Sequence, residues 1–233
     1  MPKKIFESEN LYHFTTFESA LKILLSNTLL FGKYRDMNDI NESMRILYGG
    51  LYNKNKIEEL ENKENEIEKY QQLSFTMDID SINKGFELSP MWGHYADKGR
   101  GVCLVFDKNI LISLLPQGVQ HGKIEYTNDK SNFKDLEADN VLKEIFFKKF
   151  MDWKYENEYR IILTSNSLQR ERLDIKDLLK GIITLFDGDN KEMLKKLNIE
   201  IPIFHYTCLA GHYSLISDNE HYSKHDEWED IKE

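Results

Sequence analysis

Hydrophobic and polar positions follow two different periods at the start of the chain. The short aromatic run at 11–15 is typical of a strand, whereas the apolar residues at 17–24 recur at helical spacing. Thr16, immediately before them, is a suitable N-cap, and Asn27 is a suitable end for the helix. Residues 29–31 then indicate a second strand. The pattern therefore predicts strand, helix and strand in succession.

Helical and strand-like patterns are mixed through the rest of the chain. Amphipathic spacing predicts a strongly charged helix near 54–70 and another helix over 135–151. Ser89 and Pro90 supply the N-cap and the first-turn residue of a shorter helix. Apolar runs predict further strands at 72–77, 102–106, 123–126, 158–163 and 201–209. Both types of element are well represented, so we expect an α+β fold.

The chain has no obvious linker between large domains, since its 233 residues contain only four prolines and no Gly/Ser-rich run. We expect one domain over 1–217, which includes the charged helical segment near 54–70, and a solvated acidic tail over 218–233. Cys103 and Cys208 lie far apart and outside any CxxC pattern, so neither a disulfide framework nor a zinc ribbon is indicated. A reducing cytosol is the natural compartment for such a chain.

The charge balance narrows the classes of partner. Asp and Glu total 40 against 31 Lys and Arg, and the formal charge of -9 gives no support to sequence-independent binding of nucleic acid or anionic membranes. No stretch approaches the roughly 18 apolar residues of a membrane span. The N-terminus also lacks the apolar core of a signal peptide. We therefore expect a cytoplasmic protein that has no membrane partner.

Two segments carry aromatic and polar side chains that suit a ligand. His13 and Thr15 project from the same face of the first predicted strand, where they form a binding surface or where His13 is a hydrogen-bonded part of the core. Trp92 and Tyr95 are three positions apart on the short helix, so they form an aromatic wall that either stacks on a base or packs in the core. Arg100, between two glycines, fits a phosphate contact or an exposed turn.

The segment WKYENEYRIIL carries the clearest chemical pattern. Glu156 and Glu158 are expected on one face at the start of a strand, and Arg160 continues the alternation. Two neighbouring carboxylates in different environments can orient a hydroxyl and stabilise developing positive charge, as in oxocarbenium-like glycosyl chemistry. An edge strand with alternating solvated charges fits the same spacing.

Several other catalytic motifs are absent from the sequence. It contains no HEXXH, no GxSxG elbow, no Walker loop and no Rossmann glycine fingerprint. His205 and His212 lack a third ligand at a recognisable spacing. We therefore expect no metal ion.

Four segments in combination resemble the bacterial domain-of-unknown-function family 2971. They are LYHFTTFESALKILLSNTLLF, the ND-x-x-E of Asn38, Asp39 and Glu42, MWGHYADKGRGVCLVFD, and WKYENEYRIIL. The resemblance spans roughly 11–186. Departures are minor: many relatives have a proline after the asparagine-aspartate pair, where this chain has Ile40.

The same order of segments is similar, more distantly, to the ADP-ribosyltransferase superfamily. That similarity implies an α+β fold with a split β-sheet core and surrounding helices, and it implies NAD as a cosubstrate. The residues to which it gives a role are His13 and Thr15 in NAD contacts, Trp92 or Tyr95 in nicotinamide stacking, and Glu158 in catalysis with Glu156 as an auxiliary group. Arg35, in the loop after the second predicted strand, becomes a phosphate or target contact.

The resemblance also implies an arrangement and an activity. We expect His13, Asn38, Tyr95 and Glu158 to line one cleft, with Asn38 among the residues that bind NAD. The implied activity is transfer of ADP-ribose from NAD to a macromolecular acceptor, either protein or nucleic acid, or NAD hydrolysis. The kind of protein that the resemblance implies is a toxin or a phage-defence effector that acts with a defence-system partner. The alternatives are a noncatalytic nucleotide-binding or protein-interaction module, and a plain structural domain.

Overall fold

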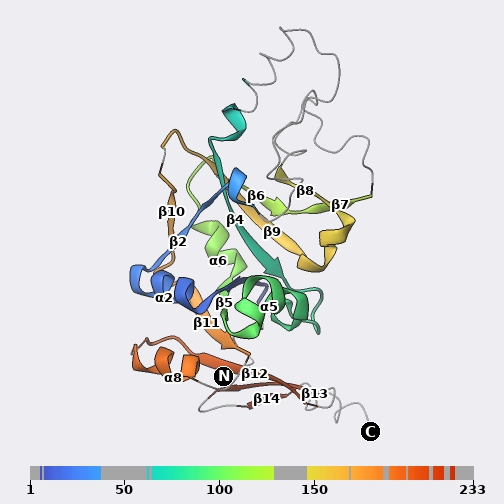
Figure 1. The fold of residues 1–233 in the computed structure, drawn as a ribbon, viewed down its shortest axis with the longest axis vertical. Helices are drawn as coiled ribbons and strands as arrows, with labels where there is room; N and C mark the ends of the chain where they lie inside the picture. The colour runs from blue at the N-terminus through green and yellow to red at the C-terminus, as the bar shows by residue number, and fades with distance from the viewer. Residues whose placement is uncertain are drawn as a thin grey trace.

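The computed structural model describes residues 6, 8–37, 62, 65–128, 146–167, 169–185, 189–197, 199–209, 212–217 and 221–223. Within these ranges, ten strands form one large mixed sheet in the order β14-β13-β12-β11-β5-β1-β4-β9-β6, with β3 paired to β4 (Figure 1). Their bounds are β1 (Asn10–Thr15), β3 (Gly32–Lys33), β4 (Tyr70–Met77), β5 (Val102–Asp107), β6 (Gln120–Lys123), β9 (Glu158–Thr164), β11 (Leu179–Thr184), β12 (Ile203–Leu209), β13 (His212–Ser217) and β14 (His221–Ser223). The pair β11 and β12 is parallel.

Smaller elements surround this sheet. Two small sheets pair β2 (Thr28–Leu30) with β10 (Arg172–Asp174) and β7 (Glu125–Thr127) with β8 (Lys148–Phe150). The helices are α2 (Phe17–Ser26), α5 (Ser89–Tyr95), α6 (Lys108–Ser113) and α8 (Asp189–Lys196), with short 3₁₀ turns η1 (Tyr34–Asp36), η2 (Gly85–Glu87), η3 (Asp97–Gly99) and η4 (Met151–Glu156). Among the described residues, no helix has the length and apolar character needed to cross a membrane. The mixture of helices and strands confirms the expected α+β class.

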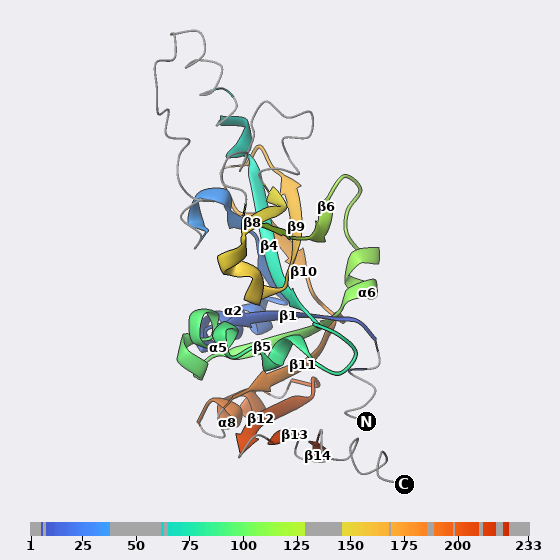
Figure 2. The ribbon, with the colours of Figure 1, turned by 90° about the vertical axis from the view of Figure 1, so that its right-hand side faces the viewer.

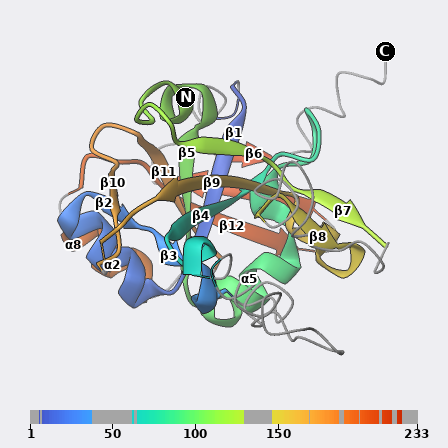
Figure 3. The ribbon, with the colours of Figure 1, turned by 90° about the horizontal axis from the view of Figure 1, so that it is seen from above.

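The large sheet divides between β1 and β4. These two strands are paired at only two positions, Leu11 with Met77 and Tyr12 with Thr76. By contrast, β1 pairs with β5 along its whole length, and β4 pairs with β9 from Tyr70 to Thr76. Figures 2 and 3 show β4 and β9 running across the direction of β1 and β5. The sheet therefore opens beyond Tyr12 and Thr76, and this opening is where the candidate site lies.

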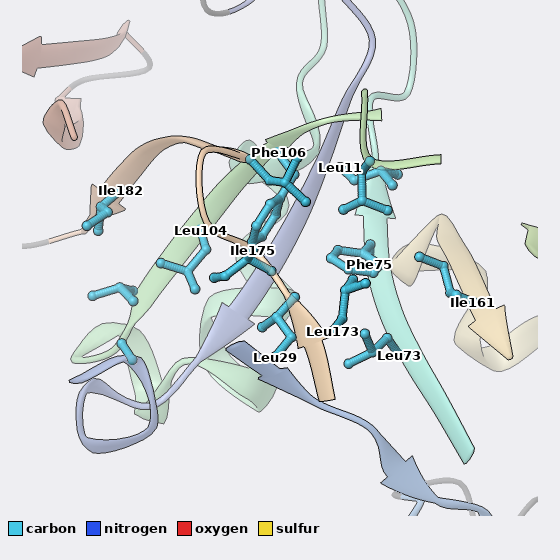
Figure 4. Close-up of a cluster of buried hydrophobic side chains, with 14 of the residues drawn as sticks. Leu11, Leu29, Leu73, Phe75, Leu104, Phe106, Ile161, Leu173, Ile175 and Ile182 are labelled. Atoms are coloured by element: carbon cyan, nitrogen blue, oxygen red, sulfur yellow. The ribbon is translucent and has the colours of Figure 1, made fainter. Parts of the chain in front are cut away.

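Two hydrophobic clusters pack on opposite faces of the sheet. One contains Leu104 and Phe106 of β5, is covered by α2, and is drawn in part in Figure 4. The other contains Cys103 and Val105 of the same strand and is covered by α5. Because successive side chains of a strand point to opposite faces, the continuous apolar run VCLVF is explained by burial on both sides.

Several local predictions agree with the structure. The Thr16 hydroxyl accepts a hydrogen bond from the backbone N–H of Ser19 at 3.2 Å, so Thr16 caps α2 as expected. Asn27 ends that helix in the left-handed conformation, with φ of 51°. The N-cap of α5 is Leu88, however, and Ser89 is its first helical residue. The helix start was therefore predicted one residue too late.

Two helix predictions need correction. The helix expected over 135–151 lies outside the described residues up to position 145, and its end is wrong, because β8 occupies the positions before Met151 and pairs in parallel with β7. Pairing with a distant segment overrides the local amphipathic pattern here. The charged helix expected near 54–70 also falls mostly outside the described residues; residues 62 and 65–67 are helical as expected, but Tyr70 already belongs to β4. The strand β14 lies within the segment expected as an acidic tail and pairs with β13.

Candidate functional site

A cleft of about 260 Å³ lies where β1 and β4 diverge. Its lining comes from β1, β2, β3, η1, β4, α5, β8, η4 and β9, so segments far apart in the sequence meet there. The sequence-predicted residues among the lining are His13, Tyr95, Glu156 and Glu158. An apolar cavity of about 150 Å³ already holds benzene. The cleft therefore has room for an aromatic ring with a polar substituent.

His13 is a hydrogen-bonded histidine that also faces the cleft. Its Nδ1 lies 3.2 Å from the carbonyl oxygen of Ser74, and its ring centroid is 5.7 Å from that of Phe75. A carbonyl oxygen only accepts, so Nδ1 carries the proton. Burial lowers the pKa of His13, which favours the neutral ring. The other ring nitrogen, Nε2, is therefore a hydrogen-bond acceptor.

Four buried charged side chains meet beside the cleft. The Nζ of Lys149 lies 2.7 Å from Oε2 of Glu156 and 2.8 Å from Oε2 of Glu158. Arg160 donates to both oxygens of Glu158, from Nε at 2.7 Å and from Nη2 at 2.9 Å. Its Nη1 donates to the carbonyl oxygen of Phe146 at 2.7 Å. The two carboxylates thus share one lysine, and Glu158 also holds a bidentate arginine.

These partners give the two carboxyl groups different acidities. Burial raises the pKa of Glu158, but Arg160 and Lys149 outweigh burial and hold this pKa far below its usual range. Burial likewise raises the pKa of Glu156, and there it prevails over the opposing effect of Lys149. Glu158 is consequently held as a carboxylate, whereas the charge on Glu156 is less strongly stabilised.

The expectation of one strand face bearing both glutamates is wrong in its geometry. Glu156 ends the 3₁₀ turn η4, and Asn157 follows in the left-handed conformation, with φ of 44°. Only Glu158 belongs to β9, and the turn brings Glu156 to the same cleft. The alternative of a solvated edge strand also fails, because β9 lies between β4 and β6 and Arg160 is fully buried.

The expected aromatic wall divides into a cleft residue and a core residue. Tyr95 lines the cleft, and its hydroxyl donates to Oε1 of Glu156. Trp92 is 2% exposed, and its indole N–H donates to the carbonyl oxygen of Phe86 at 2.7 Å. Its ring packs edge-on against Phe14 at 5.2 Å. Trp92 therefore serves the core below the site.

The remaining sequence-predicted residues lie away from the cleft or outside the described residues. Thr15 is buried at the end of β1, opposite Val102, and is not among the lining residues. The backbone of Arg35 lies in η1, whereas its side chain and the whole of Asn38 lie outside the described residues. Arg100 forms an exposed ion pair with Asp97 at 2.9 Å, which agrees with the exposed-turn interpretation.

Sequence reasoning missed two components of the site. The first is the polar row Gln72, Ser74 and Thr76 of β4, which lines the cleft. Its signal is present in YQQLSFTM as polar residues alternating with apolar ones. The second is Lys149, which had no such signal, because it lay within a segment expected to be helical.

Potential metal ligands do not gather among the described residues. No group of three or more His, Cys, Asp or Glu side chains in that part of the chain is arranged to hold an ion. His205 is buried in β12, and the side chain of His212 lies outside the description.

Comparisons with known proteins locate one family resemblance. Neither the curated proteins nor the solved structures gave a match to this chain. A match to one family model begins at Met91, in α5, and ends at Ile161, in β9. It therefore contains Tyr95 and both cleft glutamates. Residues 91–161 of the chain match the model of a family described as a protein of unknown function, DUF2971, which supports the resemblance to that family.

Proposed function

We propose that the cleft binds NAD and that the protein transfers ADP-ribose from NAD to a macromolecule or hydrolyses NAD. The observation that carries this proposal is the convergence of His13, Tyr95, Glu156 and Glu158 on one cleft. The cleft lies at a split in an α+β sheet, as the more distant resemblance to ADP-ribosyltransferases implies. A site of this kind acts in a toxin or a phage-defence effector.

Each cleft residue has a role that suits this reaction. The bond between nicotinamide and ribose C1′ breaks and its electron pair leaves with neutral nicotinamide, so positive charge develops on the ribose. A nucleophilic atom of the acceptor, or water, then bonds to C1′ and releases its proton. The carboxylate of Glu158 stabilises that charge and accepts a hydrogen bond from a ribose hydroxyl. Neutral His13 offers an acceptor to NAD, and the ring of Tyr95 stacks on nicotinamide. Arg35 and Asn38 keep the NAD-binding roles that the resemblance gives them.

The protonation states favour Glu158 over Glu156 as the essential group. The charge-stabilising role needs a group that is ionised in the free protein, and the cationic neighbours of Glu158 keep it so. Glu156 is the auxiliary group that binds Lys149 and Tyr95.

One observation favours the noncatalytic alternative. Both oxygens of Glu158 already accept hydrogen bonds from Arg160, and Lys149 lies within 2.8 Å of the same carboxylate. A carboxylate so fully engaged also suits a rigid nucleotide-binding or protein-interaction module that has no turnover. Binding and turnover must therefore be measured separately.

Two measurements test the proposal. Calorimetry with NAD, with and without a chelator, is expected to detect binding that does not require a metal. Incubation of the protein with labelled NAD and lysate is expected to release nicotinamide and to label either protein or nucleic acid. Glu158→Gln, assayed where it is folded, should lose roughly a hundredfold in rate, equivalent to about 3 kcal/mol. The matched control is Glu192→Gln on α8, an exposed glutamate away from the cleft.

The outcomes separate the two functions. NAD binding without nicotinamide release supports the noncatalytic module. A lack of NAD binding at millimolar concentration refutes the proposal, and so does nicotinamide release by folded Glu158→Gln at the wild-type rate.

A further inference from the structure

The floor of the cleft is one polar face of a strand whose other face is apolar. Gln72, Ser74 and Thr76 of β4 line the cleft. The alternating residues Leu73, Phe75 and Met77 pack in the hydrophobic cluster beneath. Of the polar row, Gln72 and Thr76 are buried, whereas Ser74 is half-buried.

Two of these polar side chains are buried without satisfying their hydrogen-bonding groups. Gln72 is 3% exposed and Thr76 is 1% exposed. Among the described residues, no partner lies within hydrogen-bonding distance of Oε1 of Gln72 or Oγ1 of Thr76. The amide nitrogen of Gln72 lies against the sulfur of Met37. The group of Gln72 that lacks a partner is therefore its acceptor oxygen.

Unpaired buried polar groups weaken a fold, so native proteins contain few of them. A leucine or methionine at position 72 and a valine at position 76 would fill similar volumes without this penalty. Two such groups on one cleft floor indicate that their partner is a ligand. Buried polar groups that lower the stability of the fold without compensation are typical of functional sites.

The positions of the two groups restrict the ligand. Gln72 and Thr76 are four residues apart, which is about 13 Å between Cα atoms at the usual rise of a strand. Thr76 lies opposite Glu158 in the register of β4 and β9. The same cleft has an apolar and aromatic lining from Phe14, Met91 and Tyr95. The ligand thus needs a hydrogen-bond donor for the Gln72 oxygen, a donor or an acceptor for the Thr76 hydroxyl, and an apolar ring.

At the Gln72 end, the described lining offers no cation to a phosphate. Gly32, which pairs with Gln72, and Met37, which contacts it, are uncharged, and Asp36 is an anion. An uncharged donor such as the N–H₂ of a carboxamide suits Oε1 of Gln72. The Thr76 hydroxyl, beside Glu158, suits a sugar hydroxyl.

We propose that Gln72 and Thr76 determine the specificity of the cleft for a ribosylated aromatic carboxamide. Gln72 accepts from the carboxamide, and Thr76 bonds a ribose hydroxyl next to Glu158. This assignment rests on the proposed NAD function and adds the two residues that read the ends of the nicotinamide riboside moiety.

Matched variants test the assignment. Thr76→Val and Gln72→Met remove the unpaired groups and nearly conserve volume. The controls are Thr184→Val and Gln71→Met, because both residues are buried and hydrogen-bonded. The hydroxyl of Thr184 donates to the carbonyl oxygen of Phe204 at 3.2 Å. Gln71 donates to the carbonyl oxygen of Gln169 at 3.1 Å and accepts from the N–H of Glu171 at 2.7 Å.

Two quantities are measured for each variant: the thermal midpoint of the free protein, and the affinity for NAD and for nicotinamide riboside. Thr76→Val and Gln72→Met should keep or raise the midpoint and weaken both ligands tenfold or more. Thr184→Val and Gln71→Met should lower the midpoint and leave both affinities within about twofold of wild type.

The results that overturn the assignment differ from those that overturn the function. If the wild type binds NAD and the two cleft variants bind it equally well, Gln72 and Thr76 do not read the ligand, and the NAD proposal stands. If Thr76→Val lowers the midpoint as much as Thr184→Val, its hydroxyl serves the fold. If the wild type binds neither ligand, the proposed function fails and the assignment fails with it.

Discussion

Replacing Glu158 by glutamine should destabilise the protein as well as impair any catalysis. Glu158 and Arg160 are 3% and 0% exposed, so their ion pair is almost fully removed from water. The two carboxylates and two cations of the cluster balance in formal charge, and Glu158→Gln leaves one uncompensated positive charge. The amide N–H₂ of the new side chain also faces the donors of Arg160, where it cannot accept.

The size of the loss follows from that burial. Breaking a buried pair by removing one partner costs about 3–5 kcal/mol, because the remaining ion stays desolvated. For a domain of this size, 1 kcal/mol corresponds to about 2–4 °C in thermal midpoint, so a shift of roughly 6–20 °C is expected. Removal of both ions should cost far less, since apolar side chains of similar volume often replace a buried pair without loss.

The assay is urea unfolding of wild type, Glu158→Gln, Arg160→Met and the double variant Glu158→Leu/Arg160→Met. Each single variant should be much less stable than wild type, whereas the double variant should recover most of the loss. A Glu158→Gln protein within 1 kcal/mol of wild type would show that the pair is solvated or replaceable, contrary to the geometry. The thermal midpoint of Glu158→Gln then sets the temperature range in which its turnover assay is meaningful.

The pH dependence gives an independent check with a definite sign. The pKa of Glu158 in the folded protein lies below its usual value of 4.5, so its contribution to stability is complete above that pH. That contribution is lost as the pH falls through the folded pKa. The pKa of Glu156 is raised, so its contribution has the opposite sign and declines as the pH rises above 4.5. The stability difference between wild type and Glu158→Gln should therefore shrink on acidification below pH 4.5.

Two further predictions concern the aromatic residues of α5. Trp92→Phe should cost about 1–3 kcal/mol in urea unfolding, because the buried carbonyl of Phe86 loses its donor, and should leave NAD affinity unchanged by calorimetry. A tenfold loss of affinity would place Trp92 in the ligand site. Tyr95→Phe should raise the pKa of Glu156 further, since the Tyr95 hydroxyl bond lowers it, and carboxyl NMR titration measures this. An unchanged Glu156 pKa would contradict the observed contact.

Local chemistry made part of the fold predictable. The Thr16 cap, the left-handed Asn27 and the two-sided apolar strand β5 depend on neighbouring residues and on burial period. Rules of this kind depend on residues close in the sequence, and the structure agrees with them at these three features. The strand β8 shows where such rules stop, because its pairing with β7 depends on a segment more than twenty residues away.

The lining of the cleft was predictable only in part. Resemblance selected His13, Tyr95, Glu156 and Glu158, which line the cleft, but also Thr15 and Trp92, which do not. It could not separate Tyr95 from Trp92, because residues three apart on a helix lie on adjacent but different parts of its surface. In a helix of only seven residues, that small angular difference decides between the cleft and the core.

Lys149 gives the second glutamate a physical role in either proposed function. In the noncatalytic module, Glu156 and Glu158 neutralise a lysine that burial would otherwise make costly. In ADP-ribose transfer, the positive charge that develops beside Glu158 also approaches Lys149. At 4 Å two like charges repel by about 4 kcal/mol in a medium of effective dielectric constant near 20. Under the proposed reaction, Glu156 lowers this opposition by holding Lys149 through its own carboxylate. In that reaction, the auxiliary glutamate would act on the transition state through the lysine that both carboxylates share.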